Sequence, residues 1–259
     1  MRLAAAILVV SAGCGRLSYD QLAAESTDSG VDVDASAACT VQLGAGREHF
    51  CLLTPSDGAV RCWGDNQFGQ LGIGNMDDQP SPVTVPLDGP AVDVNGGRYE
   101  TCAALDSGLA YCWGEGSSGQ LGDGLGATSP SPVLVDTLTD IPDIAVGAIH
   151  ACARQSSGQV YCWGNNGLGR LGLGTSGGTE LSPVPVPALT DARELAMSGG
   201  STTCTIRSDD SLWCWGNNAQ GSVGDGTLSP PLQPVPATRS RRSPMPLACS
   251  EQGSVTFKA

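Results

Sequence analysis

Cysteine is the residue type whose number and spacing most suggest chemistry in this chain, which has 259 residues and 11 cysteines. Eight of them form four local pairs: Cys51/Cys62, Cys102/Cys112, Cys152/Cys162 and Cys204/Cys214. A turn-like stretch separates the two members of each pair, which predicts a β-hairpin with one cysteine on each arm. Facing residues of an antiparallel pair lie about 4.5–5.5 Å apart at Cα, within reach of a disulfide. We therefore expect four disulfides inside hairpins, with buried thiols as the alternative.

The cysteine pattern also bears on metal binding and on the cellular compartment. Zinc sites use closely spaced cysteines and histidines, whereas this chain has no Cys-x-x-Cys and only two histidines. Disulfides instead predict an oxidising compartment. Three cysteines remain outside the pairs: Cys14, Cys39 and Cys249. Cys39 and Cys249 lie near the two ends of the repeated region, and a disulfide between them, joining the first repeat to the last, is a hypothesis.

The histidines and carboxylates form no catalytic constellation. His49 and His150 each stand two residues before the first cysteine of a pair, where the other two repeats carry Glu100 and Thr202. This variety predicts a structural hydrogen-bonding position, because triad catalysis needs one histidine singled out from the rest. The aspartates of the glycine-rich loops lack the spacing of a calcium loop. We expect no catalytic residue, no metal and no cofactor; a hydrolase using loop carboxylates is the alternative.

The elements that position the cysteines repeat along the chain. A tryptophan-glycine cassette follows the second cysteine of each pair, at intervals of 50, 50 and 52 residues. Its copies are Trp63-Gly64, Trp113-Gly114, Trp163-Gly164 and Trp215-Gly216. Self-similarity at such a period indicates an array of small units that bury their apolar faces against one another. The recurrent tryptophans are expected to pack between these units.

The order of segments is the same in every repeat. An alternating apolar segment precedes a short strand with the first cysteine; a turn, a second strand, a glycine-rich loop and a Pro-Val step follow. No window shows a helical period. Three or four short strands per repeat suggest the blades of a β-propeller. We expect the loop glycines to supply positive φ angles and close contacts between blades, because no helix follows them to bind phosphate.

The segment from Trp63 to Gly72 carries Trp-Gly, then Asn66, then Gly-Gln-Leu-Gly, and it resembles the regulator of chromosome condensation repeat. The resemblance implies an all-β fold of four-stranded blades, and the founding members of the family have seven of them. Four blades are clear here, and residues 239–259 are expected to be a degenerate or partial fifth blade. The fold class expected is therefore a β-propeller, or an open propeller-like arc, of about four to five blades.

A low blade count has a possible consequence and a possible cause. An open arc would expose strand edges, which invite pairing with another chain, so self-association through open blade edges is one expected interaction. A truncated or frame-shifted gene product is the alternative explanation of the count.

The N-terminus resembles a lipoprotein export signal. Arg2 precedes an apolar run far too short to span a bilayer, and small residues then precede Cys14. We expect residues 1–13 to be a signal peptide of the lipoprotein type and Cys14 to carry the lipid; an ordinary secretory signal and an unrelated apolar segment are the alternatives. Residues 14–38 are polar and acidic, as in a flexible tether, and the repeat array follows at 39–238.

Charge and setting narrow the function. A net charge of −13 opposes binding to nucleic acid, because the chain would repel the phosphate backbone. The leading hypothesis is a non-enzymatic binding scaffold, exported and membrane-anchored on the bacterial cell envelope, with a protein or glycan ligand. The family resemblance implies an alternative, a guanine-nucleotide exchange factor for a small GTPase. The export signal, the cysteine pairs, the charge and the blade count oppose that alternative.

Overall fold

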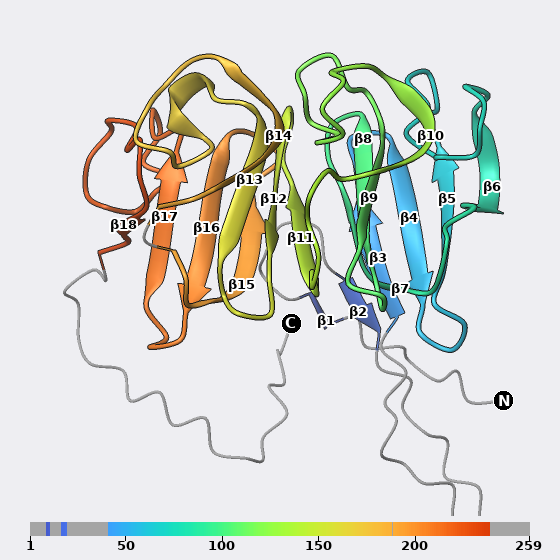
Figure 1. Cartoon of the computed structure of the whole chain (residues 1–259), viewed down its shortest axis with the longest axis horizontal. Helices are drawn as coiled ribbons and strands as arrows, with labels where there is room; N and C mark the ends of the chain where they lie inside the picture. Colours follow the sequence, from blue (N-terminus) through green and yellow to red (C-terminus); the bar gives the residue numbers. More distant parts are fainter. Residues whose placement is uncertain (1–8, 11–16, 20–40, 188, 239–259) are drawn as a thin grey trace, which may run out of the picture.

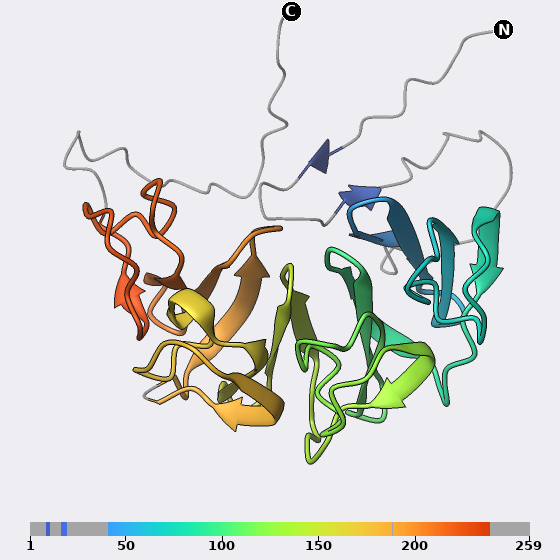
Figure 2. The ribbon, with the colours of Figure 1, turned by 90° about the horizontal axis from the view of Figure 1, so that it is seen from above.

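The structure is a computed structural model that describes residues 9–10, 17–19, 41–187 and 189–238. It is built from antiparallel sheets that stand side by side (Figure 1). The described residues contain no α-helix and one 3₁₀ turn, η1 (Gly167–Gly169). Seen from above, the blades form an arc that is open on one side (Figure 2). The predicted all-β, propeller-like fold is thus confirmed, and the described residues form an open arc of four blades.

Each blade has four strands that follow one another in sequence and in space. Blade 1 contains β3 (Val41–Ala45), β4 (His49–Thr54), β5 (Ala59–Gly64) and β6 (Gln79–Thr84). Blade 2 contains β7 (Ala91–Gly96), β8 (Glu100–Leu105), β9 (Ala110–Gly114) and β10 (Ser129–Leu134). Blade 3 contains β11 (Asp143–Val146), β12 (His150–Arg154), β13 (Val160–Asn165) and β14 (Thr179–Pro185). Blade 4 contains β15 (Ala192–Met197), β16 (Thr202–Arg207), β17 (Leu212–Gly216) and β18 (Val235–Pro236).

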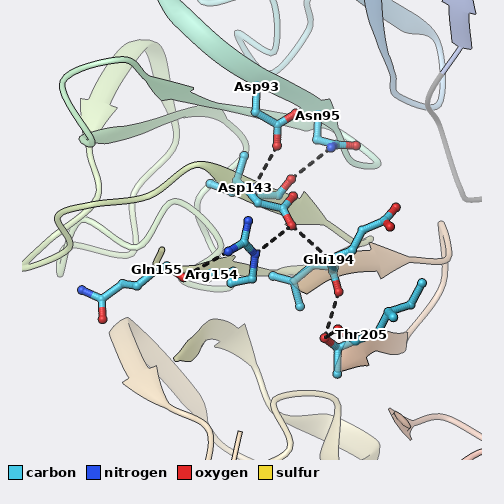
Figure 3. Close-up of polar contacts among 10 residues, drawn as sticks. Asp93, Asn95, Asp143, Arg154, Gln155, Glu194 and Thr205 are labelled. Carbon is cyan, nitrogen blue, oxygen red and sulfur yellow. Dashed lines mark hydrogen bonds and ion pairs between the residues drawn. The ribbon is translucent and has the colours of Figure 1, made fainter. Parts of the chain in front are cut away.

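The first strands of the blades lie on the inner side of the arc and hold one another through side-chain hydrogen bonds (Figure 3). The Ile144 N–H of β11 donates to Asp93 Oδ2 of β7 at 2.9 Å, and the Leu195 N–H of β15 donates to Asp143 Oδ2 of β11 at 3.0 Å. Asn95 adds a bond from its Nδ2 to the Ile144 carbonyl at 3.0 Å. Because a buried amide without a partner is costly, these side chains fix where the next inner strand lies.

The hydrophobic core lies between neighbouring blades. Each boundary joins the face that carries one blade's cysteine pair, here called the rear face, to the face that carries the next blade's tryptophan, here called the front face. At the first boundary Cys51, Leu53 and Val60 pack with Leu105 and Trp113. Burying a side chain such as Leu53 stabilises the fold by about 2 kcal/mol. A single blade cannot bury both of its faces, which is why the repeats occur as an array.

The strand register brings the two cysteines of each hairpin face to face. Cys51 lies opposite Cys62 across β4 and β5, and the other three blades repeat this register. The structure joins all four pairs by disulfides, each with a Cα–Cα distance of 4.1 Å. The bonds are Cys51–Cys62, Cys102–Cys112, Cys152–Cys162 and Cys204–Cys214. The alternative of buried free thiols is therefore not what the structure has.

The outer strand of each blade lies against the second cysteine of the pair. Val83 and Val133 of the Pro-Val steps lie opposite Cys62 and Cys112. In blades 3 and 4 the same register places Val184 opposite Cys162 and Val235 opposite Cys214. Proline is tolerated beside these valines because an outer strand has a free edge.

Several predicted features lie outside the described residues. These are most of the expected signal peptide and tether, all of 239–259, and Cys14, Cys39 and Cys249. Within the first two segments the structure describes only β1 (Val9–Val10) and β2 (Leu17–Tyr19). Strand β2 pairs with β3 and so extends the inner edge of blade 1. Among the residues with described positions, no helix is long and apolar enough to cross a membrane.

Candidate functional site

The loops that join the first and second strands of the four blades surround a cavity of about 460 Å³, here called the loop pocket. Two arginines line it, Arg47 from blade 1 and Arg98 from blade 2. Its other lining residues are small: Ala45, Gly46, Gly96, Gly97, Ala148 and Gly199. Each loop turns tightly, as shown by the bond from the Gly97 N–H to the Glu100 carbonyl at 2.8 Å. Short loops with small side chains therefore leave an open space whose polar side chains are two guanidinium groups.

An aromatic side chain holds the two arginines together at the pocket. Arg47 Nη1 donates to the Tyr99 hydroxyl at 2.7 Å. The guanidinium carbons of Arg47 and Arg98 lie 5.7 Å and 5.0 Å from the centre of the Tyr99 ring, within cation–π range. Phe68 packs on the same ring with a centroid distance of 4.7 Å. Guanidinium groups bind carboxylates and phosphates in two-pronged geometry, so this cluster is suited to an anionic group.

A buried layer of polar side chains lies under the loops. His49 and His150, predicted to be structural, form hydrogen bonds across the blade boundaries. His49 Nε2 pairs with Thr101 Oγ1 at 2.8 Å, and His150 Nε2 pairs with Thr203 Oγ1 at 3.1 Å. Burial lowers the pKa of His49 to about 4 and that of His150 to about 3. Both imidazoles are therefore neutral at pH 7. Their place in the core suits them to holding blades together rather than to proton transfer with a substrate.

Glu100 occupies the same position in blade 2 and is also fully buried. Its Oε2 accepts the Tyr99 N–H at 3.0 Å. Burial raises the pKa of the Glu100 carboxyl well above its usual range, because the charged form loses its contact with water. Ala151 stands where the other internal boundaries place Thr101 and Thr203, and so offers no hydroxyl to pair with Glu100. In the part of the chain that the structure describes, no group of three or more metal-ligating side chains converges.

The predicted cysteine sites are structural and lie away from the loop pocket. All of Cys51, Cys62, Cys102, Cys112, Cys152 and Cys162 are fully buried, and Cys214 is 2% exposed. In blade 4, Cys204 is partly buried because no described blade follows it. Bonded and enclosed in this way, the eight sulfurs hold hairpins closed and offer no thiol for chemistry.

The internal tryptophans each fill a socket in the glycine-rich loop of the preceding blade. Trp113 donates its indole N–H to the Gln70 carbonyl at 2.9 Å. The same bond recurs from Trp163 to Gln120 at 2.9 Å and from Trp215 to Arg170 at 3.0 Å. These three rings are fully buried, as expected for packing between blades. Trp63 differs: it is only partly buried and stacks on Phe50 at 5.9 Å.

Glycine is required where the loop meets the indole. Gly72 has a φ of +71°, and a methyl group there would come within 2.7 Å of Trp113 Nε1. Gly122 and Gly172 share the positive φ and the contact with the next tryptophan. The loop glycines therefore shape the sockets, which confirms the prediction that they supply positive φ angles and close contacts between blades. The cassette glycines also have positive φ, from +97° to +108°, at Gly64, Gly114, Gly164 and Gly216.

In three of the blades, an asparagine side chain stabilises the long loop through hydrogen bonds to the loop backbone. Asn66 Oδ1 accepts the Leu71 N–H at 3.0 Å, and Asn66 Nδ2 donates to the carbonyls of Asn75 and Asp77, each at 3.0 Å. Asn166 and Asn218 accept equivalent N–H groups. Blade 2 has Gly116 at this position. Asn66 is part of the family motif in the sequence, but its role as a loop clamp was not predicted.

The cluster of Arg47, Arg98 and Tyr99 was not predicted from the sequence. A signal was present, because arginines are few in an acidic chain and each of these two follows closely after the end of an inner strand. The meeting of the loops that carry Arg47 and Arg98 at one pocket could not be predicted from the sequence.

The sequence matches two family models of the regulator of chromosome condensation (RCC1) repeat. One model matches residues 57–104, 107–154 and 157–206, more than half of the chain. A second model of the same repeat matches residues 41–70 and 143–170. The chain belongs to the RCC1 repeat family. RCC1-type repeats in a propeller-like arrangement support a binding or regulatory scaffold.

Solved structures show the same fold at low sequence identity. The RCC1-repeat chain aligns with human WBSCR16 at a TM-score of 0.70 and 23% identity, over 77% of this chain and 53% of that one. It aligns with a structure of Kap60 bound to yeast RCC1 (Prp20) at a TM-score of 0.65 and 22% identity, over 78% of this chain and 51% of that one. For Prp20p from Saccharomyces cerevisiae the TM-score is 0.65 and the identity 19%, over 80% of this chain and 52% of that one. The chain thus spans about half the length of these structures. No curated protein matches the sequence significantly.

Proposed function

We propose that this RCC1-repeat protein is a non-enzymatic scaffold that binds an acidic segment of another protein at the loop pocket. The observation that carries the proposal is the cluster of Arg47, Tyr99 and Arg98 at the pocket. Arginine and tyrosine are among the side chains that most often dominate the binding energy of protein interfaces. The cavity between the four loops is large enough for a side chain or a short turn to enter.

The pairing of four other arginines supports this assignment. Arg61, Arg154, Arg193 and Arg207 each lie within 3.5 Å of an aspartate. Arg98, in contrast, forms no ion pair within the described residues, and its guanidinium carbon lies 5.0 Å from the centre of the Tyr99 ring. Arg47 faces Glu48 at 3.6 Å, but both side chains are at least half exposed, so that pair is weak. Two guanidinium groups at the pocket are thus available to an incoming carboxylate.

The test uses a fluorescein-labelled hexaglutamate peptide as the probe. Fluorescence polarisation at low salt is expected to show binding that weakens as salt rises, because the contact is between exposed charges. Replacing both pocket arginines (Arg47→Ala with Arg98→Ala) is expected to weaken binding by at least about tenfold, in the range of interface hot spots. Arg193→Ala, which removes an exposed arginine elsewhere, is the matched control. Equal affinity of the double variant and the control would refute the proposal.

The cellular setting is part of the proposal. The protein is exported and anchored through a lipid on Cys14, with the array held off the envelope membrane. The facing cysteine pairs support an oxidising compartment, because a disulfide in a reduced compartment would not persist. The intact mass of the membrane fraction tests it: a chain that starts at Cys14 with acyl mass added is expected, and an unprocessed chain in the soluble fraction would overturn it.

Nucleotide exchange on a small GTPase is the second candidate. The observation in its favour is the fold shared with Prp20p, a protein studied for its binding to Gsp1p and histones. Release of labelled GDP from a small GTPase of the host, measured with and without the purified chain, separates the two functions. Acceleration of release would replace the scaffold proposal.

A further inference from the structure

The three internal blade boundaries follow one rule. A tryptophan on the front face of one blade enters the glycine loop on the rear of the blade before it, and the indole N–H meets a loop carbonyl. A loop glycine close to that carbonyl has φ of +70° to +72° and touches the indole ring in each case. Because the same contact recurs at three boundaries, it shows what any boundary between two blades of this chain requires: a tryptophan on one face and a glycine-loop socket on the other.

The rear face of blade 4 carries the same socket without a tryptophan among the described residues. Gly224 has a φ of +76°, like its counterparts, but a methyl group there would meet only Ala237 Cβ, at 3.6 Å. Ser222 stands at the position whose carbonyl accepts the indole N–H in the other blades. The loop thus keeps the conformation that receives a tryptophan.

The apolar surface around this socket is also uncovered. Ile206 and Leu212 flank the Cys204–Cys214 pair of blade 4 and are 36% and 46% exposed. Their counterparts in blade 1, Leu53 and Val60, are 4% and 0% exposed because blade 2 covers them. The sequence therefore keeps apolar residues at a face that nothing in the described fold covers, which marks an interaction surface.

The front face of blade 1 carries the complementary half. Trp63 is partly buried there, and Phe50, stacked beside it, is 41% exposed. Their counterparts in blade 2, Thr101 and Trp113, are fully buried against blade 1. Strand β2 pairs along the inner edge of β3 and leaves this face open.

We propose that two copies of this chain associate head to tail, with the front face of blade 1 of each copy against the rear face of blade 4 of the other. Trp63 then enters the socket at Gly224 and donates to the Ser222 carbonyl of the partner copy. Each arc is open on one side (Figure 2), and two such contacts close a ring of eight blades. The contact is heterologous, because a front face has an indole to insert and only a rear face has a socket to receive it.

Sedimentation equilibrium of the full chain, carrying Cys14→Ser to keep it free of lipid, tests the proposal. A dimer is expected at micromolar concentration. Phe50→Glu on the front face and Leu212→Glu on the rear face are each expected to give monomers, with a dissociation constant raised at least about tenfold. Leu125→Glu, at a loop residue that is 75% exposed and lies on neither face, is the matched control and is expected to stay dimeric.

A mixing experiment tests the direction of the contact. The Phe50→Glu variant keeps an intact rear face and the Leu212→Glu variant keeps an intact front face, so the mixture is expected to form a heterodimer through one contact. Association that only one of the two variants weakens would mean a contact between like faces and would overturn the proposal. A monomeric parent chain, with the faces covered by segments of its own, would overturn it, and so would filaments.

Discussion

Trp113 of blade 2 donates its indole N–H to the main-chain carbonyl of Gln70 in blade 1, at 2.9 Å. The bond joins the cassette of one repeat to the glycine loop of the preceding repeat, across 43 positions of the chain. It satisfies a polar group of the largest side chain in the core, so the ring can be fully buried without an unpaired donor. The cassette and the glycine loop of each repeat therefore determine both which blades are neighbours and how closely they pack.

Replacing Gly72 by alanine is expected to destabilise the fold. The added methyl would lie 2.7 Å from Trp113 Nε1, and φ is +71° at this position. Left-handed backbone strain and overpacking together are expected to lower the free energy of unfolding by about 3 kcal/mol, measured by urea denaturation. Gly177→Ala is the control, since φ is +90° there and no atom lies within 4 Å of the added methyl. Equal losses in the two variants would show that the indole contact contributes nothing.

Replacing Asn66 by alanine is expected to loosen the long loop of blade 1. The change removes the acceptor of the Leu71 N–H and the donor to two carbonyls. A loss of about 2 kcal/mol is expected, because the buried Leu71 N–H is left without its acceptor and two partly buried hydrogen bonds are lost. Hydrogen exchange of the Leu71 amide measures it directly, and exchange is expected to accelerate there and not in blade 2, which has Gly116 at this position. Unchanged exchange at Leu71 would contradict the role given to Asn66.

Removing one disulfide is expected to cost stability without changing the fold. The double change Cys102→Ala and Cys112→Ala deletes the bond that closes a hairpin in blade 2. In the chain-entropy description a loop of this size contributes roughly 2–3 kcal/mol. Guanidinium denaturation of the oxidised variant and of the parent chain gives the difference. Reductant is expected to narrow the gap, and a gap that reductant leaves unchanged would mean that the parent cysteines are not bonded in solution.

Acid is expected to weaken the blade boundaries through the buried histidines. Burial lowers the pKa of His150 to about 3, below its ordinary value of 6.5, with a smaller effect from the charge of Arg170. The unfolded chain therefore binds a proton more readily, so this contribution is present above pH 6.5 and is lost as pH falls towards 3. The full loss is on the order of 5 kcal/mol. Glu100, whose pKa is raised by burial, acts in the opposite sense and stabilises the fold at low pH.

Thermal unfolding of His150→Gln against the parent chain, at pH values from about 7 to about 4, isolates the histidine. The variant is expected to be the less stable protein at neutral pH and to lose less stability on acidification. A parallel pH dependence of the two proteins would show that His150 keeps an ordinary pKa in the fold.

The repeated motif allows the structure within a blade to be predicted, but not the contacts that a blade makes with its neighbours. The facing positions of Cys51 and Cys62 follow from hairpin geometry, whereas the pairing of the Pro-Val step with the second cysteine was not predicted; its place on an outer strand agrees with the need for a free edge at proline. The difference between Trp63 and Trp113 could not be predicted, because the two stand in the same motif and differ only in whether a preceding blade covers them. The meeting of Arg47 with Tyr99 is of the same kind, since the two residues are 52 positions apart and face each other only after the blades have packed.

All four cysteine pairs close loops within single hairpins, and no disulfide among the described residues crosses from one blade to another. Covalent strength is thus local, while cohesion along the array depends on apolar burial and on a few hydrogen bonds at each boundary. In a one-dimensional array of this kind, stability is a sum of unit terms and nearest-neighbour terms. Under a pulling force or in mild denaturant, blades 1 and 4 would detach at their boundaries as closed units, ready to dock again without searching for their hairpin register.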